Sequence, residues 1–248
     1  QKPIGKTPRS TVASYLEVFD NIRKIFAETE LAQTNGFTAS DFSMNTPGGR
    51  CEFCQGTGFQ KIELNYLPDS FVECAECGGR RYHEDVLLVK YKDHTINDIL
   101  NTPINELIEY FKDILPVHSK LKFVVEIGIG YISLGQMSMN LSGGEAQRIK
   151  LAKSLGTSKK NKKIYILDEP TSGLNSQDIE LFEKIILKLE EQGETIIIIE
   201  HNLEFITRVS DYLLDFGTEA GKLGGKDVAK GLPEDVFENP ASSWFGCI

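Results

Sequence analysis

The second half of the chain alternates apolar runs with an amphipathic stretch. Residues 164–167 read IYIL, residues 195–199 read TIIII, and a third run (YLLDF) follows. Continuous apolar runs of this length are typical of strands buried on both faces of a parallel sheet. Residues 179–193 have the period of an amphipathic helix and end at Gly193, a typical helix stop. We therefore expect an α/β fold with parallel strands at about 164–168, 195–200 and 212–216.

The first half of the chain combines helical patterns with a hairpin pattern. Apolar spacing predicts helices near residues 15–28 and from about 95 to 122. Residues 61–66 alternate, residues 70–74 are strand-like, and a Leu-Pro-Asp turn separates them. We expect a β-hairpin between the two helical regions, with a further strand at 86–91.

Four of the five cysteines form two CxxC pairs around this hairpin. Cys51 and Cys54 make the first pair, Cys74 and Cys77 make the second, and nineteen residues separate Cys54 from Cys74. Two thiolates in one tight turn can occupy adjacent corners of a tetrahedron, which is the geometry of Zn²⁺. Four sulfurs leave no position for water, so we expect a structural zinc ion. The alternatives are two disulfides, which a cytosolic setting disfavours, or plain buried thiols. We expect Cys247 to be an unrelated free thiol.

A glycine pair stands at the start of a helical pattern after residue 141. Glycines there expose the first backbone N–H groups, and the helix dipole adds positive potential. We therefore expect the segment to bind an anion such as a terminal phosphate, whereas the alternative is an ordinary Ser-capped helix. The expected nucleotide-binding residues are Ser142, Gly143, Gly144 and Glu145.

Acidic residues and a histidine follow the two predicted buried strands. The carboxyl ends of parallel strands are where open α/β sheets bind ligands. Asp168 can hold Mg²⁺ there through oxygen, and Glu169 can orient or deprotonate an attacking water. His201, at the end of the next strand, can reach a γ-phosphate. The alternatives are a solvated acid pair and a structural histidine.

Composition limits the partners of the chain. Its 248 residues carry a formal net charge of −9, which argues against a generic nucleic-acid coat but leaves local basic surfaces open. No stretch approaches the roughly 20 apolar residues of a membrane helix, and no basic-then-apolar leader is present. We therefore expect a cytoplasmic protein that does not enter a membrane.

Taken in order, these segments resemble the ATP-binding-cassette ATPases. "LSGGE" is similar to the signature motif, "IYILDE" to Walker B, "SGLN" to the D-loop and "EHN" to the switch histidine. The cysteine module ahead of the signature narrows the resemblance to the A subunits of the UvrABC excision nuclease. "PIGKTPRS", "GGRCEFCQGTG" and "IEHNLE" extend it over essentially all 248 residues.

This resemblance implies a DNA-damage-recognition ATPase of nucleotide excision repair that uses ATP or ADP with Mg²⁺. The implied partners are damaged double-stranded DNA, a UvrB-type subunit and a second copy of the protein. Glu169 and His201 take the catalytic roles, and Asp168 belongs to the nucleotide site. Basic side chains near the cysteines would displace counterions from the DNA backbone. These expected DNA contacts are Arg50, Lys61, Arg80 and Arg81.

The triplet Gly5-Lys6-Thr7 ends like a phosphate loop but lacks its context. A phosphate loop needs GxxxxGK[ST] between a strand and a helix, whereas here the first glycine and the strand are missing. By resemblance, Gln1 matches the Q-loop glutamine, which places Walker A before residue 1. We expect the C-terminal fragment of a longer protein, nearly inactive as an ATPase by itself.

The predicted organisation is a cassette lobe with an inserted Cys₄ zinc β-hairpin module and a helical connecting region. Two other functions stay open: a zinc-stapled protein-interaction module, and a UvrA-like paralogue linked to drug self-resistance. The predicted segments are a Q-loop and N-terminal helical region (1–45), the zinc module (46–92), a helical connector (93–122) and the signature, Walker B and switch-histidine lobe (123–248).

Overall fold

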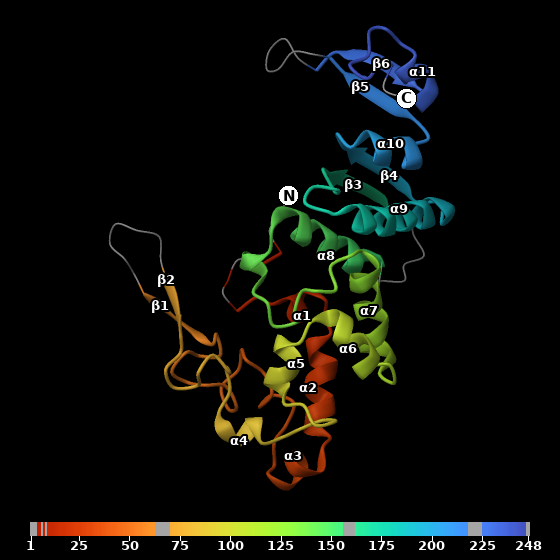
Figure 1. Cartoon of the computed structure of the whole chain (residues 1–248). Helices are drawn as coiled ribbons and strands as arrows, with labels where there is room; N and C mark the ends of the chain where they lie inside the picture. The colour runs from red at the N-terminus through yellow and green to blue at the C-terminus, as the bar shows by residue number, and fades with distance from the viewer. Residues whose placement is uncertain are drawn as a thin grey trace. The chain divides into compact units, whose positions relative to one another are not determined.

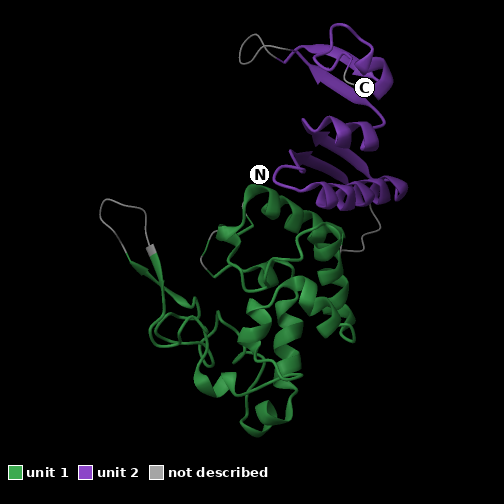
Figure 2. Ribbon diagram, viewed as in Figure 1, with its two compact units in different colours: residues 1–159 green, residues 160–248 purple. Residues whose placement is uncertain are grey.

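The chain divides into two compact units, residues 1–159 (unit 1) and residues 160–248 (unit 2), coloured separately in Figure 2. The computed structural model describes residues 4–5, 7, 9–62, 70–155, 162–217 and 225–246. Both units bury apolar side chains of their own. The predicted α/β class is confirmed, while the four predicted segments stay a prediction.

Unit 1 is mainly helical (Figure 1). The helix predicted near residues 15–28 is confirmed as α2, and Glu17, with a φ of 57° that interrupts a right-handed helix, separates it from the short helix α1. The helical elements of unit 1 are α1 (Val12–Tyr15), α2 (Phe19–Ala27), α3 (Glu30–Thr34), α4 (Glu84–Leu87), α5 (Ile96–Asn101), α6 (Ile104–Tyr110), α7 (Leu115–Glu126), the 3₁₀ turn η1 (Ser138–Asn140) and α8 (Gly143–Leu155).

Three short helices, α5 to α7, confirm the helical stretch predicted from about 95 to 122. Thr95 and Asp98 form a capping box that starts α5, which satisfies backbone N–H groups at the helix start. The helices bury Ile99, Leu107 and Leu121 almost completely. This packing forms part of the core of unit 1.

The cysteine module carries the predicted hairpin. Strands β1 (Phe59–Ile62) and β2 (Ser70–Glu73) pair antiparallel, with Phe59 opposite Glu73. The predicted turn and the rest of the first predicted strand, residues 63–69, lie outside the described residues. The antiparallel pair therefore confirms the hairpin at its base.

The strand predicted at 86–91 is wrong. The chain forms α4 there, with Glu84 and Asp85 in its first turn, where acidic side chains favour the helix dipole. Val86 and Leu87 are both buried, so the residues in α4 do not alternate as those of a strand would, and within the described residues 88–91 form neither a helix nor a named strand. A run of apolar residues this short does not distinguish a strand from a helix.

Unit 2 is built around a parallel pair of strands. β3 (Ile164–Asp168) pairs with β4 (Thr195–Ile199) in the predicted parallel sense, so that Asp168 lies opposite Ile199. The amphipathic helix α9 (Ser176–Glu191) connects them, and α10 (Leu203–Val209) follows β4. The remaining elements are β5 (Leu213–Phe216), β6 (Asp227–Gly231) and α11 (Pro233–Phe237).

The predicted third parallel strand is wrong in its pairing. β5 pairs antiparallel with β6, and within the described residues it does not join β3 or β4. Leu213 and Asp215 are buried, whereas Leu214 and Phe216 are more than half exposed. This alternation is typical of an antiparallel strand that is covered on one face.

One face of the β3–β4 pair is covered and the other is open. α9 buries Phe182, Ile186 and Leu189, and Leu167 of β3 is also buried. On the alternate positions of the two strands, four isoleucines are 50–70% exposed: Ile164, Ile166, Ile197 and Ile199. A parallel pair is normally covered on both faces, so this unit presents a sheet face that the described residues leave uncovered.

No helix in the part of the chain that the structure describes is long and apolar enough to cross a bilayer.

We expect Asp215→Ala to destabilise unit 2 by about 1–3 kcal/mol, the usual cost of leaving buried donors unpaired. The buried Asp215 carboxylate accepts hydrogen bonds from Ser242 Oγ at 2.6 Å and from the Ser243 amide at 3.0 Å. Urea unfolding measures the change. The control is Asp227→Ala, which removes only an exposed pair with Lys230. Equal effects of the two substitutions would contradict a structural role for Asp215.

Candidate functional site

The four paired cysteines come together as one buried cluster in unit 1. All four sulfur atoms lie within 4.8 Å of one another. Cys51 and Cys74 are 3.9 Å apart at Sγ, and Cys54 and Cys77 are 3.8 Å apart. A tetrahedral ion with a metal–sulfur distance of about 2.3 Å holds neighbouring sulfurs about 3.8 Å apart. The sulfur set therefore fits one tetrahedral metal ion.

Backbone contacts join the two cysteine turns. The amide of Cys51 donates to Arg81 O at 2.8 Å, which links the first turn to the end of the second. The amides of Gly58 and Arg81 donate to Cys54 Sγ and Cys77 Sγ, both at 3.3 Å. Such N–H groups around sulfur orient metal ligands.

The protonation of these thiols depends on burial and on hydrogen bonds. Burial raises the pKa of Cys77 to about 12 and also raises the pKa of Cys51. For Cys74, burial acts in the same direction, but backbone N–H groups of Cys77 and Glu76 outweigh it and lower the pKa. A bound cation would supply the positive charge that four neighbouring thiolates need.

The four arginine and lysine residues predicted to contact DNA occupy two kinds of position. Arg81 is 7% exposed and its guanidinium donates to Gly135 O at 2.9 Å, which ties the module to the helical part of unit 1. Arg50 is 9% exposed and contacts the Glu52 carboxylate. Arg80, paired with Glu84, and Lys61 on β1 lie at the surface. Of the four side chains, Lys61 and Arg80 are therefore the more accessible to solvent.

The predicted phosphate-binding segment forms the start of α8. Ser142 Oγ accepts from the Glu145 amide at 3.2 Å, and the Glu145 carboxylate accepts from the Ser142 amide at 2.8 Å. This reciprocal pair is a capping box. Gly143 has open space where a side chain would be. The segment therefore combines a capped helix start with an accessible backbone.

Tyr131 joins this helix start from another part of unit 1. Its hydroxyl donates to Glu145 Oε1 at 2.8 Å. Partial burial pushes the pKa of Glu145 up, but hydrogen bonds from Ser142 and Tyr131 outweigh burial and lower it. Glu145 is thus held as a carboxylate. No local sequence pattern marks Tyr131, because the contact spans 14 positions.

In unit 2 the predicted acids and histidine lie at the carboxyl ends of β3 and β4. Asp168 is the last residue of β3. Glu169 has a φ of 46°, and its amide donates to Ile199 O at 2.8 Å. Glu169 Oε1 lies 3.7 Å from His201 Nε2, and the two side chains are 57% and 79% exposed. The structure therefore brings Glu169 and His201 side by side, on exposed loops.

Sequence reasoning missed the side chain that joins these two loops. The Glu200 carboxylate accepts from the amides of Thr171 and His201, at 2.9 Å and 2.8 Å. Burial pushes the pKa of Glu200 up, but hydrogen bonds from Thr171, His201 and Asn202 outweigh burial and lower it. The only signal in the sequence was an acid directly before the histidine.

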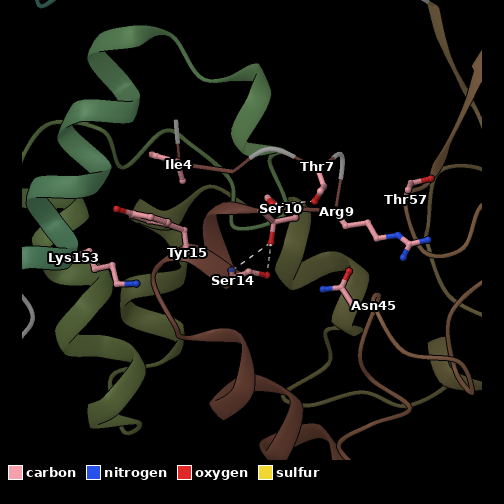
Figure 3. A pocket seen from close by; sticks show the side chains of 10 residues that line it. Ile4, Thr7, Arg9, Ser10, Ser14, Tyr15, Asn45, Thr57 and Lys153 are labelled. Carbon is pink, nitrogen blue, oxygen red and sulfur yellow. Dashed lines mark hydrogen bonds between the residues drawn. The ribbon is translucent and has the colours of Figure 1, made fainter. Parts of the chain in front are cut away.

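Unit 1 also contains a groove of about 870 Å³ beside the N-terminal segment (Figure 3). Among the described residues that line it, none is acidic, and several are hydroxyl-bearing. Arg9 donates to Gln55 Oε1 at 2.6 Å, and Lys153 pairs with Glu17 at 2.7 Å. The lining residues are Ile4, Thr7, Arg9, Ser10, Thr11, Ser14, Tyr15, Asn45, Thr57 and Lys153.

Gln1, Lys6 and Cys247 lie outside the described residues. The expected Q-loop role of Gln1 and the free-thiol assignment of Cys247 therefore stay predictions.

Comparison with known proteins supports the predicted resemblance. No family model matches the chain. UvrABC system protein A from Staphylococcus aureus (strain COL) is 48% identical over 242 residues, which are 98% of this chain and 25% of the relative. The same protein from Lactococcus lactis subsp. lactis (strain IL1403) is 48% identical over 236 residues, again 25% of the relative.

A solved structure agrees with these sequences. The crystal structure of UvrA2 from Deinococcus radiodurans superimposes with a TM-score of 0.90 at 43% identity, over 98% of this chain and 30% of that one. The chain spans about a quarter of the length of the sequence relatives. The predicted resemblance is thus confirmed: the chain is homologous, over nearly its whole length, to one part of UvrABC system protein A.

We expect the purified protein to carry one divalent metal ion per chain, because the sulfur cluster fits one tetrahedral ion. Cys77→Ser should remove the ion, and acid should release it from the unsubstituted protein, because thiolate ligands must bind protons as the pH falls. Elemental analysis measures both effects. Cys247→Ser, which changes the cysteine outside the pairs, is the matched control. A metal-free wild-type protein would contradict the assignment.

Proposed function

We propose that this chain is the C-terminal part of a DNA-damage-recognition ATPase of nucleotide excision repair. The observation that carries this proposal is the 48% identity to UvrABC system protein A over 98% of the chain. In this proposal the protein acts in the cytoplasm. It binds damaged double-stranded DNA, a UvrB-type subunit and a second copy of itself.

The proposed ATP chemistry uses two groups of residues. Ser142, Gly143, Gly144 and Glu145 contact a nucleotide held by another cassette, as the accessible start of α8 allows. Asp168 contributes a carboxylate to Mg²⁺, which neutralises charge on the phosphates. Glu169 orients or deprotonates the attacking water, and His201 contacts the γ-phosphate. Gln1 completes the proposed set as the Q-loop glutamine.

The uncovered face of the β3–β4 pair supports the proposal that further polypeptide of the cassette packs against it in the complete protein. Four isoleucines stay 50–70% exposed on that face. Burying apolar area contributes about 25 cal/mol per Å², so a bare isoleucine face is costly in water. We propose that polypeptide carrying the Walker A loop covers this face in the complete protein.

Zinc is the metal that we propose for the cysteine cluster. Four thiolates in a closed, buried set suit structural Zn²⁺, which stabilises a fold rather than binding substrate. The ion would hold the base of the β1–β2 hairpin in shape. Lys61 and Arg80 then lie on a module whose backbone is fixed at both cysteine turns.

The DNA surface that we propose combines this module with the acid-free groove. Lys61 is exposed, Arg80 is half-buried and paired with Glu84, and Arg9 at the groove is bonded only to an uncharged amide among its described contacts. Arg50 and Arg81 would act through the shape of the module, because both are buried. Hydroxyl, amide and guanidinium groups are the usual partners of DNA phosphates.

Exposed apolar residues on the hairpin and the first cysteine turn favour the second candidate, a protein-interaction module. Phe53 is 58% exposed, and Ile62, Phe71 and Val72 are 41–44% exposed. Such a surface can take a protein partner without DNA. Salt dependence separates the two functions, because DNA binding releases counterions and apolar docking does not.

The full-length protein that contains this chain is expected to hydrolyse ATP, and the isolated 248-residue chain is expected to be nearly inactive. Glu169→Gln should lower the turnover of the full-length protein by roughly 100-fold or more, within the usual contribution of general-base catalysis. A phosphate-release assay measures both proteins. Glu191→Gln, an exposed glutamate on α9, is the control. Robust turnover by the isolated chain would refute the incomplete-site proposal.

For DNA binding, we expect Lys61→Gln with Arg80→Gln to weaken binding by the full-length protein and to reduce its salt dependence. Each lost phosphate contact lowers the slope of log K against log salt by about 0.9. A fluorescence-anisotropy titration at several salt concentrations measures this slope. Lys112→Gln, which removes another exposed, ion-paired cation, is the control. An unchanged slope would count against the DNA surface and favour the interaction module.

A further inference from the structure

We propose that Glu200 is a positioning residue that fixes Glu169 and His201 relative to each other in the proposed ATP site. The expected effect on ATP turnover rests on the proposed function, whereas the contacts that support the inference all lie within unit 2. No sequence motif assigned a role to this glutamate.

The Glu200 carboxylate bridges two loops, and we call this contact set the Glu200 bridge (Glu200, Thr171, His201 and Asn202). Oε1 accepts from the Thr171 amide at 2.9 Å and from the Thr171 hydroxyl. Oε2 accepts from the amides of His201 and Asn202 at 2.8 Å and 3.3 Å. One side chain therefore satisfies four donors from the loop after β3 and the loop after β4.

The attachment points flank the proposed catalytic residues. Thr171 lies two residues after Glu169 and is 7% exposed, so this anchor is buried. The backbone of His201 is held because its amide donates to the Glu200 carboxylate. Asn202 begins α10 as its N-cap, accepting from the Phe205 amide at 3.1 Å. Movement of either loop would break contacts to the same carboxylate.

Among the described residues, the side chains of Glu169 and His201 have little besides each other to hold them. They are 57% and 79% exposed, with 3.7 Å between Glu169 Oε1 and His201 Nε2. Glu169 also adopts a φ of 46°, a left-handed conformation that persists only where neighbouring contacts impose it. The backbone contacts of the Glu200 bridge, together with the Glu169 amide bonded to Ile199 O, impose it here.

The bridge requires a carboxylate rather than an amide. Each carboxylate oxygen receives two donors, whereas glutamine has one acceptor oxygen and one NH₂ group. Glu200→Gln keeps the size of the side chain, but its NH₂ group would face the N–H or O–H donors of one of the two loops. It therefore tests the bridge with little change in packing.

The test uses the full-length protein that contains this chain. We expect Glu200→Gln to lower kcat about tenfold or more while KM for ATP stays unchanged, because small displacements of catalytic groups are costly. Thr171→Val, which removes one of four donors, should cause a smaller loss, and Thr171→Ser should restore wild-type turnover. Glu191→Gln on α9 is the matched control.

A double-substitution cycle separates positioning from a general loss of folding. If Glu200 acts through Glu169, then adding Glu200→Gln to Glu169→Gln should cause no further loss of turnover. A loss of folded protein would instead lower the turnover of both backgrounds by the same factor. Additive effects would overturn the proposal.

Hydrogen exchange tests the same contacts without nucleotide. We expect Glu200→Gln to increase amide exchange in the peptides that contain Thr171, His201 and Asn202 at least tenfold, while exchange in α9 is unchanged. Wild-type exchange together with wild-type kcat would overturn the positioning role. Absence of ATP turnover in the wild-type protein would instead refute the proposed function, and the exchange data would still decide whether the bridge exists.

Discussion

The parallel pairing of β3 with β4 is the constraint on which the proposed chemistry depends. Its register places Asp168 opposite Ile199, so the residues that follow both strands emerge at the same edge. Glu169 and His201 are 32 positions apart in the chain, yet their side chains meet there because both follow a strand of one sheet. A register shift of one residue would separate them and turn the strand faces over.

The same pairing explains why unit 2 looks incomplete. A parallel pair needs cover on both faces, and α9 supplies it on one. The isoleucines on the other face are side chains typical of a buried core, but no second layer of the described residues covers them. The homology points the same way, since the chain matches about a quarter of the length of its relatives. In the described helical part of unit 1, α5 to α7 bury apolar side chains such as Ile99, Leu107 and Leu121, although Leu115 at the start of α7 is exposed.

The sequence predicted the features that depend on local pattern. The β3 and β4 strands, the two cysteine turns and the glycine-led helix start were all visible as short motifs. The antiparallel pairing of β5 could not be predicted, because its apolar run resembles those of the parallel strands. The buried Asp215 within this run has its hydrogen-bond partners, Ser242 and Ser243, much later in the chain. Arg81 was expected at a DNA surface, but it is buried through a contact to Gly135, 54 positions away. Contacts over such distances leave no periodic signal.

The Glu145 carboxylate in unit 1 and the Glu200 carboxylate in unit 2 have the same structural role, which is to accept hydrogen bonds from backbone N–H groups. Backbone N–H groups at a helix start or a strand end need acceptors. In unit 1, Glu145 accepts from the Ser142 amide; in unit 2, Glu200 accepts from amides on both loops. Hydrogen bonds from these donors lower the pKa of both carboxyl groups, which keeps both groups ionised. These contacts hold in place the two segments that carry the proposed nucleotide contacts, the start of α8 in unit 1 and the Glu169 and His201 side chains in unit 2. Preorganisation of this kind lowers the ordering cost of binding.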